Sequence, residues 1–344
     1  MGPSLSPASR RRGANPHCPL VRLMLRFLVH RALQSLVVLA LMSFAVYGLI
    51  GLMPGDPIDL MIGANPNLTQ EDATRLRAVY GLDQPLLERY AAWAGDALSG
   101  DFGYSRGFSR PVLDVIAPRL ANTAGLMLAA FVIALAVGIP LGILAAARPG
   151  GAVDGAVNLY CFLAISMPTF WLALILIMVF AVTLGWLPAG GTGTGGGFLE
   201  SLRHLILPIA TLAIVEAGAF ARYTRAAMIE AMRQDWVRTA QAKGASLTRV
   251  LVHHALRNAL IPVTTIVALS FGGLFSGALV TETMFAYPGM GKLIFDAVMG
   301  NDYNLALVGL LFATLLTLTG NLGADLAYAA LDPRIGVSLL EDER

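Results

Sequence analysis

Long stretches without a charged side chain constrain the fold of this chain more than any other feature. A first apolar run covers residues 32–53. Four further runs without charge lie between Arg119 and Arg148, Asp154 and Glu200, Arg257 and Glu282, and Asp302 and Asp325. About 20 consecutive apolar residues allow a helix to cross the roughly 30 Å hydrocarbon core of a bilayer. The five runs therefore predict five transmembrane helices.

A sixth span is predicted over residues 204–225, where an apolar run is interrupted by Glu216. Because a carboxylate that faces lipid is costly, this helix is expected to lie among other helices or to face water. Hydrophobic residues make up 56% of the 344 residues and charged residues 13%, which is typical of a membrane protein. The sequence thus predicts an all-α polytopic membrane protein with six transmembrane helices.

The distribution of basic residues indicates which side of the membrane each loop lies on. Six spans put both termini on one side, and most of the 24 Lys and Arg residues then lie on that side. The two short loops of the opposite side carry Arg203 and Lys292. Cytoplasmic loops are enriched in Lys and Arg, so both termini are predicted to be cytoplasmic.

The chain leaves the membrane between the first two spans. Two prolines and a glycine in residues 53–57 stop the first helix. In the external segment that follows, helices are expected over residues 69–80, which open with a Thr-x-x-Asp capping pattern, and over residues 85–98. The predicted organisation is a disordered cytoplasmic leader (1–23), a first span (24–53), a soluble external insert (54–118), a transmembrane core (119–336) with a cytoplasmic loop (226–258), and a cytoplasmic tail (337–344).

A polar segment lies between spans four and five, at residues 233–246. Its charges place it outside the bilayer. Asp235 suits a helix N-cap, Gly244 suits a left-handed turn that ends the helix, and Ser246 suits the N-cap of a second helix. The segment is therefore predicted to form a short helix, a sharp break and another helix.

The short helix has one shallow face. Trp236, Ala240 and Gly244 recur at four-residue spacing, so they share a mostly small face that carries one large aromatic ring. A compact helix with such a face suits insertion into the groove of a partner protein. From spacing alone, an ordinary solvated loop is an equally good explanation.

Several sequence motifs occur together in this chain. Residues 235–244 read DWVRTAQAKG and residues 254–262 read HALRNALIP, and further motifs are IPLG at 139–142, SMPTFW at 166–171, ETMFAYPGMG at 282–291 and LDPRIG at 331–336. Together they resemble the dipeptide/oligopeptide permease family of ABC importers, which also includes nickel and glutathione permeases. In the general importer motif only Ala240, Gly244 and Leu256 match, so the resemblance is to the peptide-permease version.

The resemblance implies a type I ABC importer permease in a bacterial cytoplasmic (inner) membrane. Such a subunit pairs with a homologous second permease, is powered by two cytoplasmic ATP-binding subunits and receives its substrate from an external substrate-binding protein. Peptides lead as substrates, with nickel or glutathione as alternatives. The chain contains no G-x-x-x-x-G-K-[ST] sequence, so ATP and Mg are expected in the partner subunits and no cofactor in this chain. A net charge of +2 gives no reason to expect nucleic acid as a partner.

Two groups of functional residues follow from the resemblance and the spans. The residues expected to couple the permease to the ATPase are Asp235, Trp236, Val237, Arg238, Thr239, Ala240, Lys243 and Gly244. The substrate-pathway candidates are Ser166, Met167, Glu216 and Glu282, for which simple helix packing is at least as good an explanation. No catalytic residue is predicted. His253 and His254 are adjacent and point to different faces of a helix, so no metal site is predicted either.

Two other functional classes fit a polytopic membrane protein. An ion-coupled secondary transporter would use mid-membrane carboxylates and commonly shows internal repeats, but only Glu216 is placed that way and no repeat is visible. An intramembrane enzyme would need a nucleophile and base, or metal ligands, at one depth, and the spans offer no such set. Residues 191–197 contain a formal G-x-G-x-x-G, but no buried strand precedes it, so a flexible loop explains it better.

Overall fold

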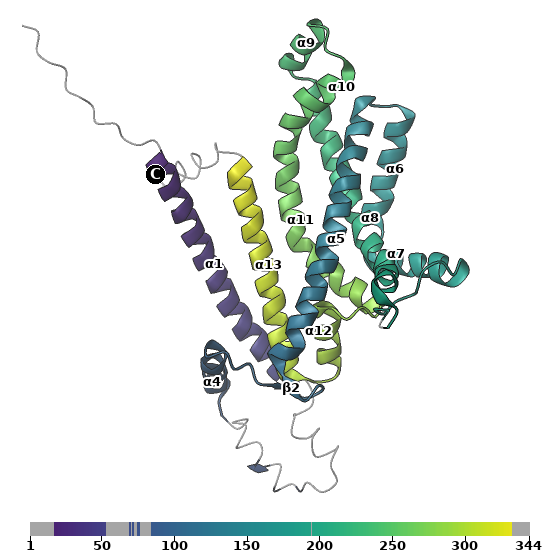
Figure 1. The fold of residues 1–344 in the computed structure, drawn as a ribbon. Coiled ribbons are helices and arrows are strands. Elements are labelled where there is room, and N and C mark those ends of the chain that lie inside the picture. The colour runs from purple at the N-terminus through teal and green to yellow at the C-terminus, as the bar shows by residue number, and fades with distance from the viewer. Residues whose placement is uncertain are drawn as a thin grey trace, which may run out of the picture.

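The computed structural model describes residues 17–52, 69, 71, 74, 75, 84–193 and 195–331, and these residues are almost entirely helical (Figure 1). The elements in chain order are α1 (His17–Gly51), α4 (Leu86–Leu98), β1 (Tyr104–Ser105), β2 (Arg110–Pro111), α5 (Val112–Ala147), α6 (Ala152–Ser166), α7 (Thr169–Leu176), the π-helix η1 (Ile177–Thr183), α8 (Gly197–Met232), α9 (Asp235–Ala242), α10 (Leu247–Arg249), the π-helix η2 (Val250–Ala255), α11 (Leu256–Met284), α12 (Met290–Met299) and α13 (Tyr303–Leu331).

Among the described residues, five helical segments are long and apolar enough to cross a membrane, and a bent pair of helices gives a sixth. The five segments are Val29–Gly51, Val112–Ala147, Gly197–Met232, Leu247–Val267 and Tyr303–Gly323, and the bent pair joins Ala152–Ser166 to Thr169–Thr183. The structure therefore agrees with the predicted all-α arrangement of six spans.

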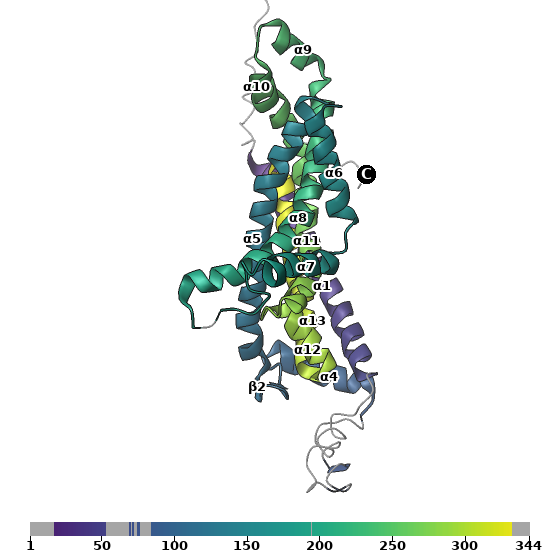
Figure 2. The same cartoon turned by 90° about the vertical axis from the view of Figure 1, so that its right-hand side faces the viewer.

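The centre of the bundle is formed by α5 and α8, which pack together over most of their length. α6 and α11 pack against α8, α13 packs against α11, and α1 packs against α13. Figures 1 and 2 show α5, α6, α8 and α11 running side by side toward α9. The start of α1, the end of α13 and α9 lie at one end of the molecule, and α4, β2 and α12 lie at the other. Both ends of the described chain thus share a side, as an even number of spans requires.

Small residues allow α5 and α8 to approach closely. A β-carbon added to Gly138 of α5 would lie 2.7 Å from the carbonyl oxygen of Ala217. A β-carbon added to Gly142 would lie 2.5 Å from Cβ of Thr224 and 2.7 Å from the carbonyl oxygen of Ala221. These glycines are four residues apart, which is the small-xxx-small spacing of closely packed membrane helices. The contact therefore requires glycine at both positions.

The third predicted span is not a straight helix. α6 and the segment formed by α7 and η1 are bent by 108° at a break around Met167 and Pro168. A proline disfavours the helical conformation in the residue before it, and Met167 is extended, with ψ of 124°. The charge-free stretch between Asp154 and Glu200 therefore holds a broken span, which bends at Pro168.

The first helix begins earlier than the sequence predicts. Residues 17–23 are expected to belong to a disordered leader, but they form the first turns of α1. Pro19 is tolerated there because backbone N–H groups in the first turn of a helix have no partner within the helix. Residues 1–16 and 332–344 lie outside the described residues.

The insert between the first two spans is partly as predicted. α4 matches the helix expected over residues 85–98. α5 begins at Val112, so residues 112–118 at the end of the predicted insert form the first turns of this helix. Most of the helix predicted over residues 69–80 lies outside the described residues.

An unexpected β-hairpin follows α4, where β1 pairs antiparallel with β2. The Ser105 hydroxyl donates a hydrogen bond of 2.5 Å to Asp302, and the same carboxylate accepts one of 2.9 Å from the backbone N–H of Gly107. The Arg106 guanidinium donates to the carbonyl oxygen of Gly300. These contacts fasten the hairpin to the turn between α12 and α13.

Candidate functional site

The predicted short helix is present as α9, at the end of the molecule where α8 stops (Figure 1). Residues 233 and 234 separate it from Met232, the last residue of α8. Asp235 is the first helical residue and Gln234 occupies the N-cap position, so the prediction that Asp235 caps the helix is wrong by one residue. The Asp235 carboxylate lies in the first turn, where a negative charge interacts favourably with the helix dipole.

Gly244 ends the helix as predicted. Its φ of 82° is left-handed. The Gly244 N–H donates to the carbonyl oxygen of Gln241 at 2.9 Å, and the Ala245 N–H donates to that of Ala240 at 3.1 Å. This pair of hydrogen bonds is a Schellman motif, which satisfies carbonyl groups at the end of a helix. A residue with a side chain would be strained in this conformation by about 1–2 kcal/mol. Gly244 therefore fixes the direction in which the chain leaves α9.

One apolar face of α9 rests on η2, the short helix that leads into α11. Val237 is fully buried and Ala240 is 9% exposed, and both pack with Val250 of η2. The predicted docking face of Trp236, Ala240 and Gly244 is therefore wrong in one respect, because this chain itself covers Ala240. Trp236 is 38% exposed. The exposed α9 face, as the name is used below, consists of Asp235, Trp236, Arg238, Thr239, Gln241 and Lys243.

The second helix of the polar segment begins after Ser246, as predicted. The Ser246 hydroxyl oxygen accepts a hydrogen bond of 3.4 Å from the Arg249 N–H. The chain then runs through α10 and η2 into α11 without a break. α9 therefore lies between the last turn of α8 and the first turns leading into α11, and it contacts both spans. In the part of the chain that the structure describes, no group of three His, Cys, Asp or Glu side chains is arranged to hold a metal ion.

An ion pair joins α6 to α8 at the α9 end of the bundle. The buried Asp154 carboxylate accepts two hydrogen bonds from the Arg225 guanidinium. It also accepts one from the backbone N–H of Gly150 and one from the Asn158 amide, both at 2.8 Å. A bidentate pair of this kind fixes geometry as well as charge. The turn between α5 and α6 is thus held against α8 about three helical turns before α9 begins.

The pathway candidates Ser166 and Met167 lie at the bend between α6 and α7. They line an open hollow of about 430 Å³ together with Leu163, Pro168, Phe170 and Trp171. Most of this lining is apolar, and Ser166 contributes a hydroxyl group. The two candidates therefore occupy a concave, largely apolar surface where the third span is broken.

Glu216 lies near the middle of α8 and is half-buried. Leu212 and Phe220, one helical turn to either side, are buried. No hydrogen bond or ion pair joins the Glu216 side chain to another described residue. α8 packs against α5, α6 and α11, which confirms that the span with this carboxylate lies among other helices.

Glu282 is fully buried near the end of α11. Its carboxylate accepts hydrogen bonds from the Thr123 hydroxyl at 2.5 Å and from the backbone N–H groups of Gly291 and Lys292 at 2.7 and 3.1 Å. The Thr123 oxygen accepts a further bond from the Met290 N–H at 2.7 Å. A carboxylate at a helix N-terminus satisfies free N–H groups and the helix dipole. Glu282 therefore fastens α12 to α5 and α11, which is a structural role within the chain.

Replacing Glu282 with alanine is expected to lower the free energy of unfolding by about 3 kcal/mol, because two buried donors and one partly buried donor lose their acceptor. Glu282→Gln keeps the size and one acceptor oxygen, so its loss should be smaller. Thermal unfolding of the purified chain in detergent measures both variants. An unchanged midpoint in Glu282→Ala would show that the carboxylate does not hold α12.

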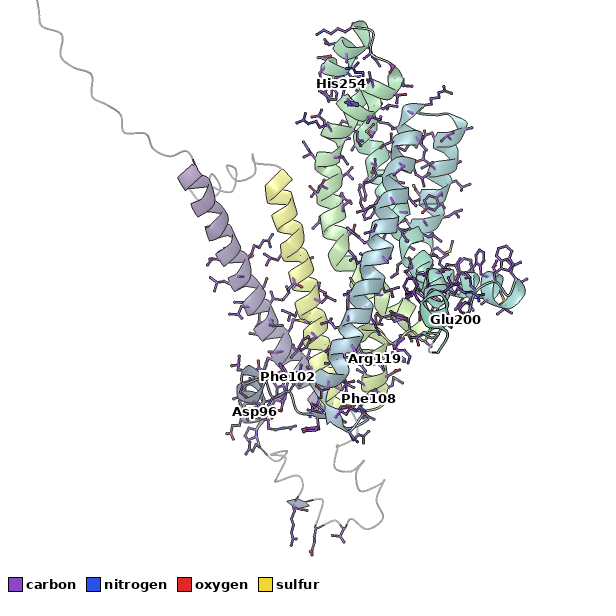
Figure 3. The ribbon with its side chains drawn as sticks, in the orientation of Figure 1. Asp96, Phe102, Phe108, Arg119, Glu200 and His254 are labelled. Atoms are coloured by element: carbon purple, nitrogen blue, oxygen red, sulfur yellow. The ribbon has the colours of Figure 1, made fainter. Side chains whose placement is uncertain are left out.

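The structure brings the predicted coupling residues together but leaves the pathway candidates apart. The coupling residues all lie on α9 and its C-terminal turn. The four pathway candidates lie at the α6–α7 bend, in the middle of α8 and near the end of α11. Figure 3 shows the length of the bundle between the two ends, with His254 near α9 and Phe108 at the opposite end.

The contacts that hold the helices together around this site were not predicted from the sequence. The Gly138 and Gly142 pair carries a readable signal, because the two glycines have small-xxx-small spacing within an apolar run. Asp154 and Arg225 carry no such signal, because nothing in the sequence pairs charges that are far apart along the chain.

Comparisons with known proteins give the family. Residues 138–337 match the model of the binding-protein-dependent transport system inner membrane component, and residues 24–127 match the model of its N-terminal region. The oligopeptide transport system permease protein AppB of Bacillus subtilis is 39% identical over 318 residues, covering 91% of this chain and 99% of that protein. The di/tripeptide transport system permease protein DppB of Pseudomonas aeruginosa is 38% identical over 317 residues, covering 85% of this chain and 93% of that protein.

A solved structure also shares the fold. The MetNI methionine ABC transporter in inward-facing conformations includes a chain that aligns with a TM-score of 0.52 at 17% identity. The alignment covers 63% of this chain and 96% of that one. The likeness at this identity concerns the fold alone, and it agrees with the helical bundle described above. Together with the family models, which match well over half of the sequence, these findings show that the chain belongs to the family of binding-protein-dependent transport system inner membrane components and is an ABC importer permease.

Proposed function

We propose that this chain is the membrane-spanning permease subunit of an ATP-driven importer of peptides. The observation that carries the proposal is the similarity, over about nine-tenths of the chain, to permease proteins named for oligopeptide and peptide transport. The motifs at residues 235–244 and 254–262 support the same subfamily. A homologous second permease, two ATP-hydrolysing subunits that bind ATP and Mg, and an external substrate-binding protein complete the transporter.

The exposed α9 face is the proposed contact with an ATP-hydrolysing subunit. It presents one large aromatic ring beside charged and polar side chains, a combination that is common at interaction hot spots. Val237 and Ala240, on the opposite face of α9, support this role because they pack the helix against η2, which leads into α11. A force applied to α9 therefore acts on two spans together.

Transport in this proposal results from rigid-body rocking of packed helices. ATP binds the two states of the ATPase pair with different affinity, and that difference shifts the permease between inward-facing and outward-facing arrangements. The close contact of α5 with α8 and the Asp154–Arg225 ion pair support movement of these helices as one body.

The α9 end of the molecule is proposed to face the cytoplasm. Arg233, Arg238, Lys243, Arg249 and Arg257 gather in and around the segment between α8 and α11. The positive-inside rule supports a cytoplasmic position for such a segment. Both ends of the described chain lie at the same end as α9, so the termini are proposed to be cytoplasmic as well.

Ser166, Met167 and Glu216 are proposed to line the substrate pathway. A hollow at a proline bend and a half-buried carboxylate with no partner among the described residues support their selection. Glu282 differs from these three residues, because its carboxylate already accepts hydrogen bonds from groups of this chain. Replacing Glu282 is therefore expected to change the stability of the permease.

The proposal is tested by uptake into proteoliposomes that contain the chain together with its partner subunits. Labelled di- and oligopeptides are expected to enter when ATP and the binding protein are present, and a catalytically inactive ATPase should abolish uptake. Nickel ions and glutathione serve as alternative substrates in parallel assays. Import of either in preference to peptides would overturn the substrate, and uptake driven by an ion gradient without ATP would overturn the transporter class.

A further inference from the structure

The helix α4 contacts α1 through a cluster of aromatic rings. The Tyr90 ring lies edge-on to Phe44 and Tyr47, with centroids 5.2 and 5.6 Å apart, and the Trp93 ring lies 5.8 Å from that of Tyr47. The Tyr90 hydroxyl is 2.7 Å from the Ser43 hydroxyl, which is itself buried. This contact sets the position of α4 along α1.

The contact lies within the apolar span and not beyond it. The candidate membrane span of α1 covers Val29–Gly51. Ser43 lies eight residues before Gly51, which is about 12 Å along the helix axis. α4 is therefore seated against the last third of this span.

One face of α4 is apolar and another is polar, as expected for a helix between lipid and water. Leu87, Ala91, Ala94 and Leu98 recur at helical spacing and form one stripe. Leu87 is 67% exposed and Leu98 is 91% exposed, so no described part of the chain covers either end of the stripe. Polar groups lie off this stripe: Glu88 is on its flank and Asp96 is on the opposite side of the helix, and both are exposed. α4 is thus amphipathic outside its contact with α1.

We propose that α4 is an interfacial membrane helix, with its Leu87–Leu98 stripe buried in the lipid leaflet at the end of the molecule opposite α9. Lipid is the occupant because α4 packs against the candidate membrane span of α1, on which Leu41, Leu49 and Leu52 are all more than half exposed. Tyr and Trp, which lie beside the stripe, are enriched at the interface between membrane and water. An amphipathic helix with an apolar face and a polar face lies in the plane of the membrane at that interface.

An interfacial α4 would tie the external insert to the membrane. Residues 54–118 are predicted from the sequence to be a soluble insert, whereas α4 would hold the end of that insert on the membrane surface. β1 and β2 follow α4 closely in the chain and are fastened to the α12–α13 turn. Lipid contact through α4 would therefore keep this end of the permease at a fixed height. The inference uses α1 as a membrane span and is independent of the substrate and of ATP.

Site-specific fluorescence tests the inference on the full chain in nanodiscs. Single cysteines replace Leu87 and Leu98 on the stripe, and Glu88 and Asp96 off the stripe, in a background with Cys18→Ser and Cys161→Ala. Each cysteine carries the environment-sensitive label NBD. The labels at 87 and 98 should show blue-shifted emission and quenching by lipids with a nitroxide in the upper acyl chain. The labels at 88 and 96 should be quenched by aqueous iodide instead.

Two results would overturn the inference. Iodide quenching at 87 and 98 equal to that at 88 and 96 would place the stripe in water. Protection of 87 and 98 from both quenchers would mean that protein, and not lipid, covers the stripe. All four positions are exposed, so the substitutions remove no buried contact, and unchanged thermal unfolding of each variant confirms that the helix bundle is intact.

Discussion

Replacing Gly142 with alanine is expected to lower the free energy of unfolding by about 1–3 kcal/mol, because the added methyl group has no space between α5 and α8. The methyl group would lie 2.5 Å from Cβ of Thr224 and 2.7 Å from the Ala221 carbonyl oxygen. Backbone atoms cannot move aside as a flexible side chain can, so the helices must separate. Gly142→Leu should have a larger effect and prevent a stable bundle.

Gly125 provides a matched control on the same helix. It is exposed, and a β-carbon added there meets no atom within 4 Å. Gly125→Ala should leave stability unchanged or raise it by up to about 1 kcal/mol, because alanine favours the helix. Thermal unfolding of both variants in the same detergent makes the comparison. Equal midpoints for Gly142→Ala and Gly125→Ala would contradict the close approach of α5 and α8.

Replacing Trp236 with aspartate is expected to abolish ATP-driven transport while leaving the permease folded and inserted. Trp236 is the one large aromatic residue of the exposed α9 face, and tryptophan at the centre of an interface commonly contributes at least about 2 kcal/mol of binding free energy. A loss of that size weakens binding about 30-fold. Substrate-stimulated ATP hydrolysis and peptide uptake by the assembled transporter should fall together.

Thr248 provides the control for this substitution. It is exposed on α10, two residues after the polar segment of residues 233–246 and outside α9. Thr248→Asp introduces the same charge and should transport at the wild-type rate. Wild-type uptake by Trp236→Asp, measured at equal protein content, would remove α9 from the coupling mechanism.

The spans and the polar helix could be predicted from the sequence because each depends on local pattern. Charge-free runs located five of the six spans, and an apolar run interrupted by Glu216 located the other. The combination of Gly244 and Ser246 located both the end of α9 and the start of the next helix. The bend in the third span carries a local signal in Pro168, but a proline also occurs inside α5 and α8, which continue through Pro140 and Pro208. Sequence alone does not separate a tolerated proline from one that breaks a span.

Contacts between distant segments could not be predicted. Ser105 and Asp302 are 197 residues apart in the sequence, and Asp154 and Arg225 are 71 apart. Each pair joins elements whose relative position depends on the whole bundle. The error on Ala240 has the same origin, because helical spacing gives the faces of α9 but not which face rests on η2.

Crosslinking from α9 tests the central claim most directly. A cysteine in place of Gln241 on the exposed α9 face, in a background with Cys18→Ser and Cys161→Ala and with a short bifunctional reagent, should capture the ATP-hydrolysing subunit in membranes that contain the assembled transporter, and the yield should change when ATP is added. A membrane-impermeant thiol reagent added outside intact cells should not reach this cysteine. Labelling from outside, or capture of no ATPase subunit by a folded permease, would contradict the account.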